Sequence, residues 1–390
     1  MSIAARPARY AVGANVWREA LSDTPDPMQA AGDVFGFGSR SSVTADRTAH
    51  ALYTELQLPI TEAIEGQLAA RHDRYDTAEH VSPKAALKWR AVPGFLLRAS
   101  YSASFKMPTL KQLYATTGVR PINLTESQCT GVGLPAGCAG TPARVVAGAN
   151  PLLEPEVGRS VDVGFVADHG PLSLSVDLWR IDKENNIATP TVDDAIRQGL
   201  YRFDPSGGWF VMQNLQNFER SRNAGVDVDA QMRFDATRLG DVTLRVAMTH
   251  TTRQATQATA ASPWSEFSGT YAKPRWRAIL AASAERGAWT ATALVRATSG
   301  FWDTVLPREQ FGALPPDGPR YVGAHEELDV GVSCRAGKSL SLTVLVKNLL
   351  DSMPPFSATN ATNGGFTQQG FAELYTARGR FLQVGVEFGF

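Results

Sequence analysis

The sequence has no long apolar run, no excess of either charge and no secretion signal at its start. No apolar stretch in its 390 residues approaches the roughly 18 residues that suggest a membrane-spanning helix. It carries 38 basic and 38 acidic side chains, which argues against a nucleic-acid binder, for which a basic excess is expected. Residues 1–10 lack the apolar core of a signal peptide, so we predict none in this chain.

Patterns of catalytic and metal-binding residues are also scarce. The six histidines are scattered, without the H-x-x-x-H or H-E-x-x-H spacing of a metal site. No G-x-S-x-G stretch marks a nucleophilic serine, and Gly36-Phe37-Gly38 lacks the third glycine of a phosphate cradle. The sequence therefore predicts no enzyme, no cofactor and no metal.

Cysteine is rare, and two of the three cysteines lie close together. Cys129 and Cys138 are nine residues apart in a stretch rich in glycine and proline, while Cys334 stands alone. In an exported protein this pair predicts a disulfide. In a cytosolic protein the same pair would be two free thiols.

What the sequence does contain is alternation of apolar and polar residues. In 172–178, the residues Leu172, Leu174, Val176 and Leu178 alternate with Ser173, Ser175 and Asp177. Such a period of two indicates strands with one apolar and one polar face. We predict about fourteen strands, at 9–20, 47–58, 63–75, 82–90, 95–106, 156–168, 172–187, 220–235, 242–253, 275–285, 289–298, 325–335, 340–349 and 378–390.

The connections between these strands differ in length in an ordered way. One set is short: 59–62, 91–94, 169–171, 236–241, 286–288 and 336–339. The other set is long, with 76–81 as the single short exception: 21–46, 107–155, 188–219, 254–274, 299–324 and 350–377. Transmembrane β-barrels show this asymmetry, because their periplasmic turns are short and their extracellular loops are long. The predicted fold class is therefore an all-β, antiparallel transmembrane β-barrel.

The last strand carries a further signal. Leu382, Val384, Val386, Phe388 and Phe390 share one face, and the chain ends on the aromatic residue. This pattern resembles the signal that outer-membrane barrels present to their assembly machinery. An ordinary edge strand is the alternative interpretation.

Five stretches resemble the TonB-dependent receptors of the bacterial outer membrane. They are 98–110, which is similar to the family's S-x-S-F-R-A-P-x-L strand end; 150–156, similar to N-P-x-L-x-P-E; 225–227, similar to G-V-D/E; 346–351, similar to V-x-N-L-x-D; and the terminal G-R…F strand at 379–390. The motif residues are Asn150, Pro151, Pro155, Glu156, Gly225, Asp227, Asn348, Asp351 and Phe390. We expect them to build the barrel rather than to contact a substrate, since proline stiffens a loop and Asn or Asp forms local turns.

The resemblance implies that the chain is only part of such a receptor. We expect residues 1–390 to be the C-terminal part of the barrel, about 14 strands of a 22-strand type, without signal peptide, TonB box or plug domain. The complete relative would import a scarce nutrient, such as a siderophore, a cobalamin-like compound or an oligosaccharide. The alternative is a truncated remnant that does not transport and acts at most as a structural piece.

The implied location is the cell outer membrane. The implied partners are outer-membrane lipid, the barrel assembly machinery and a small-molecule or oligosaccharide substrate, with the TonB complex only if a plug-bearing part exists, and no nucleic acid.

Two sets of side chains are candidates for contact with substrate or plug. The polar strand faces carry charged residues, for which a solvated wall with cross-strand pairs is the alternative: Arg98, Lys106, Asp162, Asp177, Asp227, Asp229, Arg233, Arg245, Arg296, Asp329 and Lys347. The long loops carry aromatic and amide residues, for which a membrane-interface girdle is the alternative: Phe35, Phe37, Trp209, Phe210, Trp264, Phe267, Phe301, Trp302 and Phe366, with Asn360, Asn363, Gln368 and Gln369.

Overall fold

One large antiparallel sheet contains most of the chain. The computed structural model describes residues 7–34, 39–115, 118–259, 261–313, 320–337, 339–359 and 370–389. The sheet has 15 strands; β14 pairs beside β13, and the other fourteen follow one another in chain order. Each of the fourteen predicted strands overlaps one of them. Their bounds are β1 (Arg9–Asp23), β2 (Val43–Pro59), β3 (Ile64–Tyr75), β4 (Glu79–Val92), β5 (Phe95–Lys106), β8 (Glu156–His169), β9 (Leu172–Ala188), β12 (Gln216–Thr237), β13 (Gly240–Gln257), β14 (Ser265–Glu266), β15 (Trp276–Arg286), β16 (Trp289–Thr298), β19 (His325–Ala336), β20 (Leu340–Lys347) and β21 (Phe381–Phe388).

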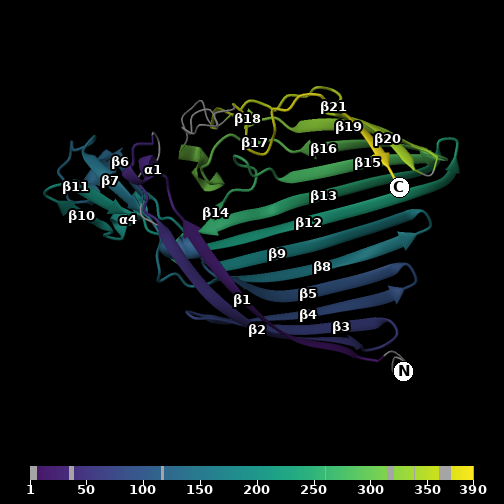
Figure 1. Cartoon of the computed structure of the whole chain (residues 1–390), viewed down its shortest axis with the longest axis horizontal. Helices are drawn as coiled ribbons and strands as arrows, with labels where there is room; N and C mark the ends of the chain where they lie inside the picture. The colour runs from purple at the N-terminus through teal and green to yellow at the C-terminus, as the bar shows by residue number, and fades with distance from the viewer. Residues whose placement is uncertain are drawn as a thin grey trace.

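The two ends of the sheet differ as the loop lengths predict. Short turns lie at one end of the strands and the long connections gather at the other (Figure 1). The turns are tight enough to select their residues. Gly240, the first residue of β13 after the turn from β12, has φ +91°, and a Cβ atom there would lie 2.0 Å from the carbonyl oxygen of Glu285 on β15. Only glycine allows this turn to lie against the neighbouring strand.

The register keeps apolar and polar side chains on opposite faces. Leu178 is paired with Val163 on β8 and with Val226 on β12, and all three belong to the apolar face. One residue earlier, Asp177 is paired with Gly164 and Asp227 on the polar face. Leu178 is nevertheless 57% exposed. An apolar face that no other element covers suits contact with lipid.

Two long connections fold together into what we call the loop subdomain, which lies beyond the end of the sheet (Figure 1). Its four-stranded sheet has the order β10-β11-β7-β6, and β7 and β11 run parallel. The connection between β5 and β8 contributes β6 (Gly118–Asn123), α3 (Glu126–Gly131) and β7 (Pro142–Ala147), and the one between β9 and β12 contributes α4 (Val192–Arg197), β10 (Tyr201–Asp204) and β11 (Gly208–Met212).

The clusters of buried apolar side chains in the described residues lie in the loops, not between layers of the large sheet. The first fills the loop subdomain around Val145, Val211 and Cys129, each at 0% exposure. The second lies around Phe301, Val322 and Ala372, where the strands β17 (Phe301–Trp302) and β18 (Tyr321–Val322) pair. The remaining helices are α1 (Pro27–Ala31), α2 (Leu110–Tyr114) and the 3-10 helix η1 (Arg308–Ala313). None of the described helices is both long and apolar enough to span a membrane.

The large sheet is open. Among the described strands, β1 pairs with β2 and β21 pairs with β20, and no pairing joins β1 to β21. The large sheet in the described part of the chain therefore does not close on itself.

Candidate functional site

An ion pair that spans three strands lies at the centre of the polar face. Arg98 on β5 reaches across β8 to Asp177 on β9: its Nε donates to Oδ1 at 2.7 Å, and a terminal nitrogen donates to the other carboxylate oxygen. The same guanidinium group donates to the hydroxyl of Ser175 at 2.9 Å. Gly164 lies between the two partners on β8, and a Cβ atom there would lie 2.0 Å from Oδ1 of Asp177. The pair can therefore form only because this position has no side chain.

Further acidic and basic groups surround this pair in a shallow groove. Asp227 is paired with Asp177 in the register, and Asp229 binds Arg245 through an ion pair of 2.6 Å. Arg98, Asp177, Asp227, Asp229 and Arg277 all line the groove. The polar face thus brings together predicted wall charges from the four strands β5, β9, β12 and β13, and Arg277 on β15, which was not among the predicted residues, joins them. The groove therefore contains both signs of charge.

A second network lies at the loop end of the polar face. Arg296 on β16 donates to Asp329 at 2.6 Å and to Glu327 at 2.8 Å, both on β19. Asp329 also accepts the backbone N–H of Asn348 at 2.8 Å and is only 6% exposed. These charges hold the ends of three strands together. They form cross-strand pairs, which is the alternative to substrate contact given above for Arg296 and Asp329.

The motif at 150–156 ties the loops to the strands. Asn150 donates from its side-chain amide to the carbonyl oxygen of Leu215 at 2.9 Å and accepts the N–H of Leu152 at 2.9 Å. Pro151 lies in the turn so formed, and Pro155 directly precedes β8. Glu156 accepts the N–H of Ile187 at 2.8 Å and binds Lys106 at 3.0 Å. These contacts are consistent with a structural role, which remains a proposal for the motif as a whole.

Gly225 and Asp227 differ in role. A Cβ atom at Gly225 would lie 2.5 Å from the Trp179 ring and 2.7 Å from the carbonyl oxygen of His250. Glycine is thus required by the close approach of three strands. Asp227 is an exposed member of the groove described above.

The motif at 346–351 forms a turn that receives the last strand. Asn348 has φ +48° and exchanges two hydrogen bonds with the backbone of Ser352, at 2.8 and 2.9 Å. Asp351 has φ +56° and accepts the N–H of Arg380 at 2.7 Å. Phe390, the remaining motif residue, lies outside the described residues.

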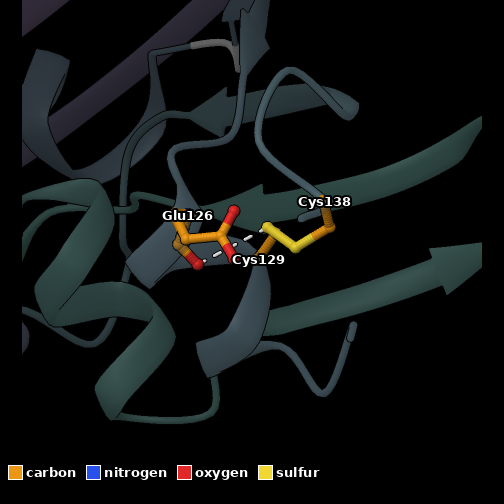
Figure 2. Close-up of side chains that lie close together, drawn as sticks. All are labelled: Glu126, Cys129 and Cys138. Atoms are coloured by element: carbon orange, nitrogen blue, oxygen red, sulfur yellow. Dashed lines mark hydrogen bonds between the residues drawn. A yellow bond between two sulfur atoms is a disulfide. The ribbon is translucent and has the colours of Figure 1, made fainter. Parts of the chain in front are cut away.

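The two neighbouring cysteines are bonded in the loop subdomain. The sulfur atoms of Cys129 and Cys138 are joined, with 6.1 Å between the Cα atoms, and Figure 2 shows Glu126 beside them. These three residues are also the group in the described chain whose ligand atoms lie close enough to hold a metal ion. A disulfide offers no thiolate to a metal. The Glu126 carboxylate accepts the N–H groups of Gly137 at 2.5 Å and Ala139 at 3.2 Å, so its role here is to hold the loop that carries Cys138.

Hydrogen bonds also fix helix α4 of the loop subdomain. Thr191 and Asp194 cap its start reciprocally, and Arg197 donates to Asp194. Burial by itself would raise the pKa of Asp194, but the hydrogen bonds from Thr191 and Arg197 outweigh it and hold the pKa below its usual value. The buried residues Ala195 and Ile196 then pack against the disulfide side of the subdomain.

Aromatic residues of the loops fall into separate groups. Trp209 packs against Tyr201 and Phe203, and Phe210 lies between the guanidinium groups of Arg144 and Arg202, 5.7 and 5.2 Å from its ring centre.

The other predicted aromatic residues lie elsewhere. Trp302 contacts Phe311 and Tyr321. The ring centre of Phe267 lies 4.1 Å from the ammonium nitrogen of Lys273. Burial lowers the pKa of Lys273, and the nearby carboxylate of Glu219 opposes this effect. Phe301 is fully buried, so it is unavailable for the predicted ligand contact. The following predicted residues lie outside the described part of the chain: Phe35, Phe37, Phe366, Asn360, Asn363, Gln368 and Gln369.

Two features of the site were absent from the sequence prediction. The loop subdomain was missed because its strands are four to six residues long and lie in connections that alternation does not mark. The Val145-Val146 pair was the available signal, since β-branched residues favour strands. The pairing of Arg98 with Asp177 was missed because it depends on register across a third strand.

The fold and the two faces define the class of this protein. A long antiparallel sheet with one apolar face, one polar face, short turns at one end and long loops at the other is an outer-membrane type β-barrel sheet. A family model described as "TonB dependent receptor-like, beta-barrel" matches residues 6–349, and the chain belongs to this family. Members of the family are transporters and receptors rather than enzymes.

Several solved structures have a similar fold. The siderophore receptor PirA from Acinetobacter baumannii is 14% identical with a TM-score of 0.67, and the alignment covers 98% of this chain and 52% of that one. A ferric enterobactin receptor (PfeA) variant from Pseudomonas aeruginosa in complex with enterobactin is 15% identical with a TM-score of 0.70 over 98% and 51%. The copper transporter OprC is 14% identical with a TM-score of 0.60 over 98% and 55%. The chain thus spans about half the length of these structures. A comparison with curated proteins found no match.

Proposed function

We propose that this chain forms part of the barrel of an outer-membrane receptor that takes up a scarce nutrient with energy from the TonB complex. The observation that carries the proposal is the membership of residues 6–349 in the receptor barrel family. The arrangement of the sheet supports it, because a polar face with charges of both signs leads to the end where the long loops gather.

The open edges of the sheet support the proposal that further strands complete the barrel. In lipid every backbone N–H and C=O group must be paired, and each unpaired group costs several kcal/mol. Strands β1 and β21 span 15 and 8 residues, so two open edges of this length would be unstable in a bilayer. Strands that pair with both edges would remove this cost.

The substrate classes that we propose are a siderophore, a cobalamin-like compound or an oligosaccharide. Two groups in the loop subdomain support a large amphipathic solute. The Trp209 cluster offers flat apolar surface, and Arg144 and Arg202 offer positive charge next to Phe210. Aromatic rings with adjacent cations suit both chelates of negative charge and sugar rings.

Energy-dependent uptake tests this function. The gene is expressed with its native flanking sequence in a host that lacks its own receptors, and uptake is measured for labelled ferric siderophores, cobalamin and oligosaccharides. We expect saturable uptake of one substrate class that stops when the TonB complex is deleted. A test variant carries Arg144→Ala and Arg202→Ala in the loop subdomain, which should raise the half-saturating concentration. The amount of receptor in the outer membrane, measured in parallel, should stay unchanged.

The competing function is a structural remnant that does not transport. It predicts uptake equal to that of the empty vector for every substrate, in cells whose outer membrane contains the protein. That result would refute the proposed import function.

A further inference from the structure

We propose that four arginines on the apolar face of the sheet bind the phosphate groups of lipid headgroups in the outer leaflet of the membrane. These residues, which we call the outer arginine cluster, are Arg159 on β8, Arg180 on β9, and Arg220 and Arg222 on β12. The inference rests on the proposed outer-membrane function, since it requires that this face meets lipid.

The register places the cluster on the apolar face. Arg180 is paired with Val161, whose neighbour Val163 is paired with Leu178 on the same face. Asp182 is paired with Arg159 on one side and with Arg222 on the other. The apolar face of β9 therefore changes from Val176 and Leu178 to charged residues within a single strand.

The cluster lies where the apolar band of a barrel ends. Strand β9 begins at Leu172, next to a short turn, and Arg180 follows eight residues later. At about 3.3 Å per residue and a tilt near 40°, this distance corresponds to about 20 Å along the membrane normal, close to the height of an apolar band of about 25 Å. The long loops mark this end as extracellular, so the cluster reaches the headgroups of the outer leaflet.

Energetics point to the same position. An arginine that faces lipid costs about 2–4 kcal/mol at the midplane and about 0–1 kcal/mol near the interface. Arg159, Arg180 and Arg220 are exposed. Three exposed guanidinium groups on one patch of this face are therefore excluded from the middle of the apolar band and are tolerated at headgroup level or outside the membrane. The distance from the short turn favours headgroup level.

The carboxylates of the patch do not neutralise it. Asp182 accepts from both Arg180 at 2.7 Å and Arg222 at 2.6 Å, and Glu184 lies 3.4 Å from Arg159. No ion pair involves Arg220 among the residues that the structure describes. The groove over the patch is lined by these four arginines and by Asp182 and Glu184, an excess of two positive charges on this face. Lys183 also lines the groove, but it is paired with Gly158 and Ser221 and belongs to the opposite face. Because guanidinium groups bind phosphate in a bidentate manner, this excess suits phosphate-bearing lipids.

A tryptophan from the loops lies against one arginine of the patch, Arg222. Trp264, from the connection between β13 and β15, lies with its ring centre 4.7 Å from the Arg222 guanidinium carbon and 5.7 Å from that of Arg253. Tryptophan is enriched at headgroup level because its ring is apolar and its N–H is polar. Arginines of the polar face differ: Arg98 and Arg245 are matched by Asp177 and Asp229 and face no lipid.

The test measures retention of lipid A, a bisphosphorylated glycolipid, by the complete receptor in detergent. Lipid A is titrated into the receptor, and the number of lipid A molecules retained per protein is measured by native mass spectrometry. Dephosphorylated lipid A serves as the ligand without phosphate, and free inorganic phosphate serves as the competitor. The test variant is Arg180→Gln with Arg222→Gln, and the matched control is Arg245→Gln, an arginine that is ion-paired on the opposite face. The variant Arg180→Lys with Arg222→Lys keeps the charge and controls for folding.

We expect the double glutamine variant to bind lipid A about tenfold or more weakly, since each cation near an anionic surface contributes about 1 kcal/mol. The control should bind as the parent does, the lysine variant should retain most binding, and dephosphorylated lipid A should not distinguish the variants. Equal binding by parent and double variant would overturn the proposal, as would displacement by free phosphate at equal concentration or an equal loss in Arg245→Gln. Lipid binding without uptake would refute the import function alone, and uptake without lipid binding would refute this inference alone.

Discussion

The carboxylate of Asp351 accepts a hydrogen bond from the backbone N–H of Arg380 at 2.7 Å, across 29 residues of sequence. A Cβ atom at Gly379 would lie 2.7 Å from the same oxygen. The bond joins the Asn-Leu-Leu-Asp turn after β20 to the Gly-Arg pair before β21. Two stretches that looked like separate family motifs are therefore one structural unit that positions the last strand.

Removing this bond should loosen the last strand. Asp351→Ala should lower the unfolding free energy by more than the roughly 1 kcal/mol typical of a hydrogen bond, because alanine is also strained at φ +56°. It should speed amide exchange in 381–388. Ser352→Ala is the control, because Ser352 bonds to Asn348 only through its backbone. Unchanged exchange in the last strand of Asp351→Ala would contradict the role given to this bond.

The two faces of β9 should respond differently to an added charge. Val176→Arg should cost about 2–4 kcal/mol in a refolding titration into lipid vesicles if the residue lies near the midplane, because its side chain faces lipid. Ser173→Arg, on the polar face of the same strand, should be mild. Asp177 is unsuitable for this comparison because it binds Arg98. Equal costs at 173 and 176 would refute the assignment of the faces.

The Arg98–Asp177 pair should be sensitive to one methyl group on the strand between them. Gly164→Ala would place a Cβ atom 2.0 Å from Asp177 Oδ1, so it should cost about 1–3 kcal/mol through overpacking. Gly385→Ala is the matched control, since its new Cβ atom would meet only Thr343 at 3.8 Å. The measurement is the unfolding free energy of both variants, and equal values would show that the gap at Gly164 is not needed.

The Cys129–Cys138 bond should be detectable and should stabilise the loop subdomain. Mass spectrometry of non-reduced peptides is expected to recover the linked pair, while Cys334, which is a free thiol in the structure, alkylates without reductant. Reduction should speed proteolysis of 118–147, because the bond limits the unfolded chain. Alkylation of both cysteines in exported protein, without reductant, would disprove the linkage.

The stability of helix α4 should depend on pH through Asp194. Because hydrogen bonds lower the pKa of this carboxyl in the folded protein, its contribution is present above the unfolded value of about 3.9 and is lost as pH falls through the folded value. Asp194→Asn should therefore weaken protection of 192–197 against amide exchange near neutral pH, by about 1 kcal/mol for the weakened hydrogen bonds of Asp194 with Thr191 and Arg197. The difference from the parent should shrink below about pH 4. A difference that stays constant down to about pH 3 would contradict the prediction.

Alternation in the sequence determined fourteen of the fifteen strands of the large sheet, all except the two-residue β14. A side chain of β9 such as Val176 or Asp177 is assigned to its face by the period of two alone, and the lengths of the connections assign the ends. These are local properties of the chain, because the backbone of any strand turns successive side chains to opposite sides.

Tertiary structure decided what depends on register and on contacts between distant segments. Whether Arg98 meets Asp177 depends on the alignment of three strands and on an empty position at Gly164. The parallel pairing of β7 with β11 joins two connections that are far apart in sequence, and its core forms only when both are present. The outer arginine cluster likewise consists of residues from three strands, and their gathering on one patch of the apolar face follows from register, which alternation within a single strand does not specify.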